Sequence, residues 1–143
     1  MKRVIILFIF LLFSVGFSAQ TKYLNGTTAT QKISKKVAIL FKDNKITEAF
    51  KELTPYWPMP KNELESLESK TIKYINIIEE RFGKSIGVLK LKNETILDIA
   101  IRETYIVRYS KSAIRLIFTY YKNNNGWIIN AFKWDDSFEE EFK

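Results

Sequence analysis

The chain has 143 residues, with 23 Lys and Arg residues against 16 Asp and Glu residues, and a formal net charge of +7 at pH 7. It contains no histidine and no cysteine. Zinc, copper, haem and iron–sulfur sites normally use histidine or cysteine ligands, so we expect no transition-metal site and no cofactor. The same absences exclude disulfides and nucleophilic catalysis that depends on histidine or cysteine.

The first 19 residues have the layout of a secretory signal peptide. Met1-Lys2-Arg3 is a basic start, an apolar run covers residues 4–13, and small residues lead to Ala19. Cleavage after Ala19 leaves 21 basic and 16 acidic residues, a net charge of +5. The alternative is an uncleaved N-terminal anchor. We expect a periplasmic or secreted protein with no stable membrane insertion after cleavage, and the lack of cysteine excludes a lipoprotein.

Residues 20–30 are polar and turn-prone, and we expect a flexible lead into a single α+β domain of residues 31–143. Apolar residues at helical spacing then predict three helices. They run from about Thr30 to Phe41, from Ile46 to Leu53, and from Pro60 or Lys61 to Phe82.

The loop after the second helix and the glycine after the third helix also carry local structural signals. The loop 56–60 contains Trp57 and two prolines, and we expect it to pack over the core, the alternative being an exposed recognition loop. Gly83 is expected to end the long helix in a left-handed conformation.

The second half of the chain predicts an antiparallel sheet of about four strands, because apolar residues recur at every second position. Lys92-Asn93-Glu94 is expected to form the first turn, and Asn125-Gly126 the last. The expected strands are Ser85–Leu91, Leu97–Tyr109, Ile114–Tyr121 and Trp127–Trp134.

Three stretches, FKDNKITEAFKEL, ERFGKSIG and RETYIVRYSKSAIRLIFTYYKNNNGWIINAFKWDD, carry a resemblance to a known family. Together they resemble small secreted bacterial proteins of unknown function with a nuclear-transport-factor-2-like, or cystatin-like, fold. The resemblance covers roughly Ile33 to Phe142. It implies a cone of two to three N-terminal helices packed on a curved antiparallel sheet. Its motifs are structural, so no catalytic residue is carried over from the wider superfamily.

Glu103 is the one charged residue on an otherwise apolar face of its strand, between Ile101 and Tyr105. A regular strand points its carboxylate into the cone, where burial raises the pKa and favours a general acid or base. The alternative is a β-bulge at Arg102-Glu103 that turns the side chain to water or into a salt bridge. We favour the bulge, because an unpaired buried carboxylate is costly.

The charged residues of the sheet indicate a possible binding surface. Arg102, Arg108 and Arg115 are expected near one another on adjacent strands, either to hold an anionic partner or to keep the sheet soluble. The acidic residues from Asp135 to Glu141 are interpreted as a solvated tail, since their spacing does not match a calcium loop. No nucleic-acid motif accompanies the basic residues, and nucleic-acid binding is not expected.

Three hypotheses on function follow. We prefer a non-catalytic domain that binds a small ligand or an envelope protein through its cone pocket or sheet face. The second is an isomerase-like or dehydratase-like enzyme with Glu103 as general base and Tyr105 or Tyr120 as hydrogen-bond donor. The third is a structural homodimer. The predicted contact residues are Glu103, Tyr105, Tyr109, Arg115, Tyr120 and Trp127.

Overall fold

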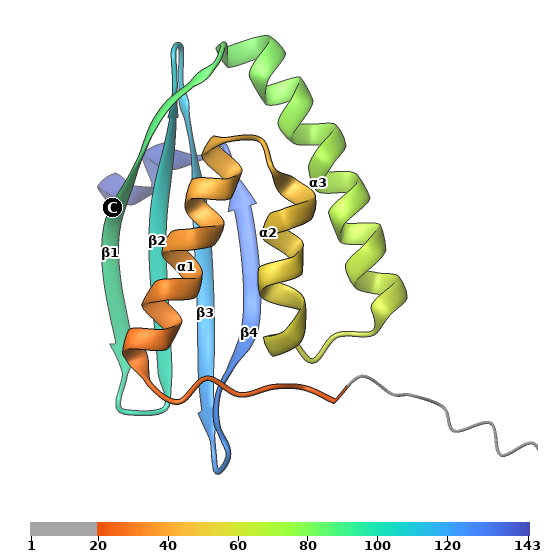
Figure 1. The fold of residues 1–143 in the computed structure, drawn as a ribbon. Helices are drawn as coiled ribbons and strands as arrows, with labels where there is room; N and C mark the ends of the chain where they lie inside the picture. Colours follow the sequence, from red (N-terminus) through yellow and green to blue (C-terminus); the bar gives the residue numbers. More distant parts are fainter. Residues whose placement is uncertain (1–19) are drawn as a thin grey trace, which may run out of the picture.

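The computed structural model describes residues 20–143, which form three helices followed by a four-stranded antiparallel sheet (Figure 1). The predicted α+β class is therefore confirmed, and the predicted signal peptide lies outside the described residues. The helices are α1 (Thr27–Lys42), α2 (Ile46–Leu53) and α3 (Lys61–Phe82), with a 3-10 turn η1 (Thr54–Tyr56) after α2. The strands are β1 (Ser85–Ile96), β2 (Ala100–Tyr109), β3 (Ala113–Asn123) and β4 (Gly126–Asp135), and a 3-10 helix η2 (Phe138–Phe142) follows them.

Helix α1 begins at Thr27, three residues before its expected start. The expected lead of residues 20–30 therefore overlaps this helix and also contacts the sheet. Leu24 is buried and forms an isolated antiparallel bridge with Trp127, in which the two residues exchange backbone hydrogen bonds of 2.9 Å. A single leucine among polar neighbours has no periodicity, so the sequence does not indicate this bridge.

The ends of α2 and α3 follow the sequence signals. Helix α2 stops at Leu53, as predicted, but the cause differs from the expected one. Thr54 keeps a right-handed helical conformation (φ −53°, ψ −43°), and the chain continues as the 3-10 turn η1. The α-helix ends because Pro55 has no backbone N–H to donate to the preceding turn. Gly83 closes α3 as predicted, with a φ of 83°. Its ψ of −167° differs from the expected left-handed helical conformation and belongs to a region open almost only to glycine. Trp57 is buried in the core, as expected for a packed loop.

The strand order β1-β2-β3-β4 is that of a simple meander. The predicted turn at Lys92-Asn93-Glu94 is wrong, since these residues belong to β1 and pair with Thr104, Glu103 and Arg102 of β2. Pairing with a neighbouring strand outweighs the local turn preference of asparagine. The chain turns instead between β1 and β2, where Leu97 adopts a φ of 48°.

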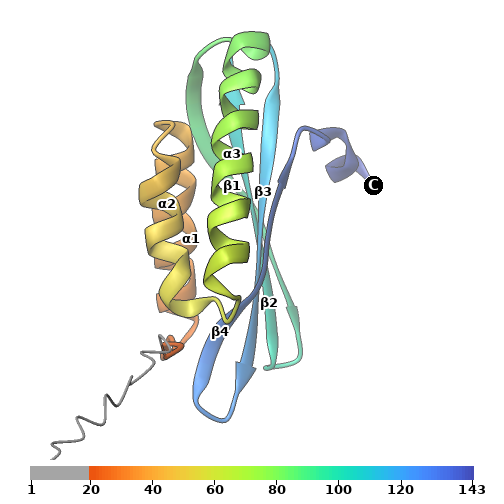
Figure 2. The same cartoon turned by 90° about the vertical axis from the view of Figure 1, so that its right-hand side faces the viewer.

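All three α-helices lie on one side of the sheet, and η2 lies on the other (Figure 2). We call these sides the helix-covered face and the helix-free face. The core between the helices and the sheet is centred on Phe132 of β4. Its ring centroid lies 5.4 Å from that of Phe41, 5.0 Å from that of Phe118 and 6.3 Å from that of Trp57. The helix-free face has no comparable cover, which makes it available for contacts with other molecules.

Candidate functional site

Glu103 lies on the helix-covered face of β2 and is completely buried, with 0% of its surface exposed. The Ser34 hydroxyl of α1 donates to Glu103 Oε2 at 2.9 Å, and Lys90 Nζ of β1 donates to Oε1 at 3.3 Å. The Tyr120 hydroxyl lies 2.7 Å from Ser34 Oγ and 3.2 Å from the Thr30 carbonyl oxygen. Both carboxylate oxygens of Glu103 are therefore already held by side chains of the protein.

The predicted β-bulge at Arg102-Glu103 is wrong, because β2 pairs with β3 in an unbroken register through these residues. The irregularity lies in the neighbouring strand β1, between Lys90 and Lys92. The additional residue, Leu91, makes Lys90 and Lys92 point to opposite faces of the sheet. Lys90 consequently reaches Glu103 from the helix-covered side, so the predicted salt bridge is present while the carboxylate stays buried.

Burial controls the protonation of this cluster. It raises the pKa of Glu103 above the ordinary value, although the Ser34 hydrogen bond and the charge of Lys90 act in the opposite direction. Burial, together with the Glu103 charge, raises the pKa of Tyr105 to about 12. Burial also raises the pKa of Tyr120. Both tyrosines are therefore protonated and neutral at pH 7.

The six predicted contact residues do not come together in one site. Arg115 pairs with Ile106 across the ladder and lies on the helix-free face. The other five lie on the helix-covered face, where each is at most 5% exposed: Glu103, Tyr105, Tyr109, Tyr120 and Trp127. Their side chains lie between the helices and the sheet and have almost no surface exposed.

A hollow of about 350 Å³ lies at the end of the sheet where α1 begins. Trp127 and Ile101, both buried, contribute to its walls, together with the exposed residue Lys122. A second hollow of about 270 Å³ lies along β1 and β2 and includes Arg102. Neither hollow is lined by Glu103. Of the predicted contact residues, these hollows include Trp127 alone.

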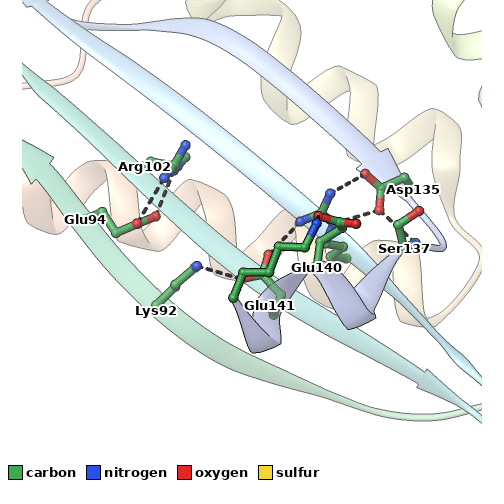
Figure 3. A network of polar contacts seen from close by, with 9 residues as sticks. Lys92, Glu94, Arg102, Asp135, Ser137, Glu140 and Glu141 are labelled. Atoms are coloured by element: carbon green, nitrogen blue, oxygen red, sulfur yellow. Dashed lines mark hydrogen bonds and ion pairs between the residues drawn. The ribbon is translucent and has the colours of Figure 1, made fainter.

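The helix-free face carries a second group of charges, which includes Arg115. We define the basic cluster as Lys92 of β1, Arg102 of β2 and Arg115 of β3. Glu141 of η2 accepts a hydrogen bond from Arg115 Nη1 at 2.8 Å. Its other oxygen lies 2.6 Å from Lys92 Nζ (Figure 3). One carboxylate thus joins cations from two strands that flank β2.

Two further carboxylates complete this network. Asp135 accepts two hydrogen bonds from the Arg115 guanidinium, at 2.7 and 2.9 Å. Glu94 accepts two from Arg102, at 2.8 and 3.0 Å, beside the Lys92 pair (Figure 3). Such two-point contacts are stronger and more directional than contacts with a single hydrogen bond. The predicted solvated acidic tail is therefore wrong for Asp135 and Glu141, whose charges pair with the sheet.

The basic cluster stabilises the ionised form of each carboxylate it contacts. The ion pair with Lys92 and the hydrogen bond from Arg115 lower the pKa of Glu141, and the hydrogen bonds from Arg115 lower the pKa of Asp135. The hydrogen bond from Arg102 lowers the pKa of Glu94. This environment is the opposite of that around Glu103, because here paired charges outweigh the effect of burial.

Apolar side chains surround the basic cluster on the same face. By their register, Leu89 and Ile96 of β1 and Tyr121 of β3 lie on the helix-free face, and all three are exposed. Phe138 and Phe142 of η2 are also exposed, the latter by 85%. A surface that combines exposed apolar residues with charged side chains held in fixed positions is typical of a protein-binding face.

The sequence pattern indicates Arg102 and Arg115 but not Lys92 and Glu141. The local pattern predicts a turn at Lys92 and a solvated tail at Glu141, and the structure contradicts both predictions. Opposite charges on neighbouring segments of the meander are the signal that could indicate Lys92 and Glu141. This signal is usable only when the strand register and the β1 bulge are known.

Comparisons with models of known protein families, with curated proteins and with solved structures gave no significant match. None of the helices in the described part of the chain is long and apolar enough to span a bilayer. Among residues 20–143, no group of three or more acidic side chains is arranged to hold a metal ion.

Proposed function

We propose that this chain is a non-catalytic binding domain whose helix-free face binds a protein partner through carboxylate groups of that partner. The main support is the position of the Glu141 carboxylate, which lies between Lys92 and Arg115 on this face. A surface that holds one carboxylate with two cations fits an acidic side chain of another protein in the same way. The exposed apolar residues around the basic cluster add contacts that a small anion does not use.

A small ligand at the hollow that includes Trp127 is the alternative for a binding domain. This hollow includes Trp127 alone of the predicted contact residues, whereas the helix-free face brings together complementary charges and exposed apolar side chains. The geometry therefore favours the protein partner.

The enzyme hypothesis has less support. It needs Glu103 as general base with Tyr105 or Tyr120 as donor, yet Glu103 has no exposed surface and both its oxygens are occupied. A general base needs hydrogen-bond reach to the proton that it removes. The homodimer hypothesis predicts that a second copy covers the helix-free face. Each copy carries both the basic cluster and the carboxylate of Glu141 on this face, so the hypothesis requires η2 of one copy to leave its own sheet and bind the other copy.

We further propose that the fold is a nuclear-transport-factor-2-like cone and that the protein is exported to the periplasm or secreted. The order of three helices followed by a four-stranded meander supports the first proposal. The basic start, apolar run and small residues of positions 1–19 support the second.

A labelled peptide of sequence FEEEF, identical to residues 138–142, tests the binding function by fluorescence anisotropy. We expect the protein to bind FEEEF in preference to the neutral peptide FQQQF. Lys92→Glu is expected to weaken binding about tenfold or more, because it reverses a charge of the basic cluster. Lys70→Glu on α3 is the matched control, since Lys70 is exposed and the change in net charge is the same.

Equal binding of the two peptides, or equal loss in the two variants, would contradict the proposal. In either case long-range attraction to a basic protein, and not the basic cluster, would explain the binding. A mass that rises with protein concentration and falls on Lys92→Glu would favour the homodimer instead.

A further inference from the structure

Glu141 is the one residue of η2 that is not exposed, and its charge pairs with the sheet. Helix η2 has five residues, none of them buried, and its own backbone hydrogen bonds are local, from Glu140 to Ser137 and from Lys143 to Glu140. Glu141 is the residue of η2 that contacts the basic cluster, and only 11% of its side chain is exposed. Short 3-10 segments with little buried surface open easily in a native protein.

The position of Glu141 coincides with the surface to which we assign partner binding. Its carboxylate lies between Arg115, whose side chain is 16% exposed, and Lys92, whose side chain is 38% exposed. These cations come from β3 and β1, so the bound carboxylate spans β2 above the buried residue Thr104. Any acidic partner segment that uses both cations must take the place of Glu141.

We propose that residues 138–143 are an internal competitor of the partner, and that partner binding exchanges Glu141 for a carboxylate of the partner. This inference rests on the proposed function, and it specifies the partner segment further. The segment carries an acidic residue with an apolar or aromatic neighbour, as Glu141 is followed by Phe142.

The physical basis of the competition is the tether. Because Glu141 belongs to the same chain as the basic cluster, it is present at a high effective concentration and occupies the cluster when no partner is near. A partner with a single weak carboxylate contact does not displace it. A partner that adds apolar contacts with Leu89, Ile96 or Tyr121 gains binding energy that η2 does not use.

The test compares Glu141→Ala with Glu139→Ala in the binding of FEEEF. Both variants lose one negative charge, but Glu139 is exposed and has no ion pair within residues 20–143. We expect Glu141→Ala to bind the peptide about tenfold more tightly than the wild type, because the tethered competitor is removed. Glu139→Ala is expected to bind like the wild type. Thermal melting checks that both variants are folded.

Two results are distinguishable. If FEEEF binding depends on Lys92 but Glu141→Ala binds no more tightly than Glu139→Ala, the internal competitor is overturned and the binding function stands. If no variant binds FEEEF, including Glu141→Ala, the binding function is overturned together with the competitor.

Discussion

Lys90 and Lys92 are two residues apart on one strand, yet they pair with carboxylates on opposite faces of the sheet. Lys90 Nζ lies 3.3 Å from Glu103 on the helix-covered face, and Lys92 Nζ lies 2.6 Å from Glu141 on the helix-free face. In a regular strand, residues i and i+2 share a face, so this separation requires the bulge at Leu91. The additional residue Leu91 thus places Lys90 in the buried cluster and Lys92 on the binding surface.

The two lysines are predicted to act independently. Lys90→Ala is expected to raise the pKa of Glu103 further, because it removes the cation that favours the ionised carboxylate, and to leave FEEEF binding unchanged. Lys92→Ala is expected to raise the pKa of Glu141 and to weaken FEEEF binding. Titration of the carboxyl carbons by NMR measures both pKa values, and a shift of Glu103 in the Lys92 variant would contradict this separation.

Glu103→Gln is predicted to change how stability depends on pH. The pKa of Glu103 is raised in the folded state, so between the ordinary glutamate value of about 4.3 and the folded value the native state holds more protons than the unfolded state. In this window the contribution of Glu103 to stability is lost as the pH rises.

Urea unfolding of wild type and Glu103→Gln at a series of pH values measures this effect. The stability of the wild type relative to the variant is expected to fall as the pH rises above about 4.3. Glu94→Gln is the control. Pairing with Arg102 lowers the pKa of Glu94, so the stability of the wild type relative to this variant is expected to fall as the pH decreases below about 4.3 and to stay level above it. FEEEF binding is expected to be the same in Glu103→Gln as in the wild type. A loss of binding would indicate that the buried cluster takes part in it.

Acid is predicted to release η2 from the sheet. Lys92 and Arg115 lower the pKa of Glu141, so the contact contributes stability above the unfolded glutamate value of about 4.3 and is lost as the pH falls through the lower folded value. Amide hydrogen exchange at Glu140 and Lys143 is expected to lose protection in this acidic range, after correction for the intrinsic rate. Loss of protection at or above pH 6 would rule out Glu141 as the attachment.

Gly126→Ala is predicted to destabilise the fold by about 1–3 kcal/mol, the usual cost of a strained backbone position. Gly126 has a φ of 136°, and an added Cβ would lie 2.7 Å from the Leu24 carbonyl oxygen. This substitution therefore disturbs the bridge between Leu24 and Trp127. Gly87→Ala on β1 is the control, since an added Cβ there meets nothing within 4 Å, and we expect a change of about 0.5 kcal/mol or less. Equal melting temperatures of the two variants would contradict the strain at Gly126.

Local signals predicted the helices and the meander well. The stop of α2 at Leu53 follows from Pro55, which has no N–H to donate, and the end of α3 follows from the positive φ of Gly83. These features depend on the conformational limits of one or two residues, which a sequence displays directly. The boundary between β1 and β2 depends on pairing with β2 and on a left-handed leucine at Leu97, and neither has a local signal.

The candidate site was predictable only in part, because it depends on register. Arg115 was named from its place on a strand, but Lys92 joins it only through the bulge at Leu91. The burial of Glu103 likewise follows from the unbroken pairing of β2 with β3 and from the Ser34 hydroxyl, which a distant helix supplies. Contacts of this kind join residues far apart in sequence, so periodicity alone does not indicate them.

The most direct test of the binding surface is an NMR titration of the ¹⁵N-labelled protein with FEEEF. If the peptide binds the basic cluster, the largest amide shifts are expected at Lys92, Thr104, Arg115 and the residues of η2, and these shifts are expected to saturate together. Shifts confined to the hollow around Lys122 and Trp127 would contradict this account and would favour the alternative of a small ligand at the end of the sheet.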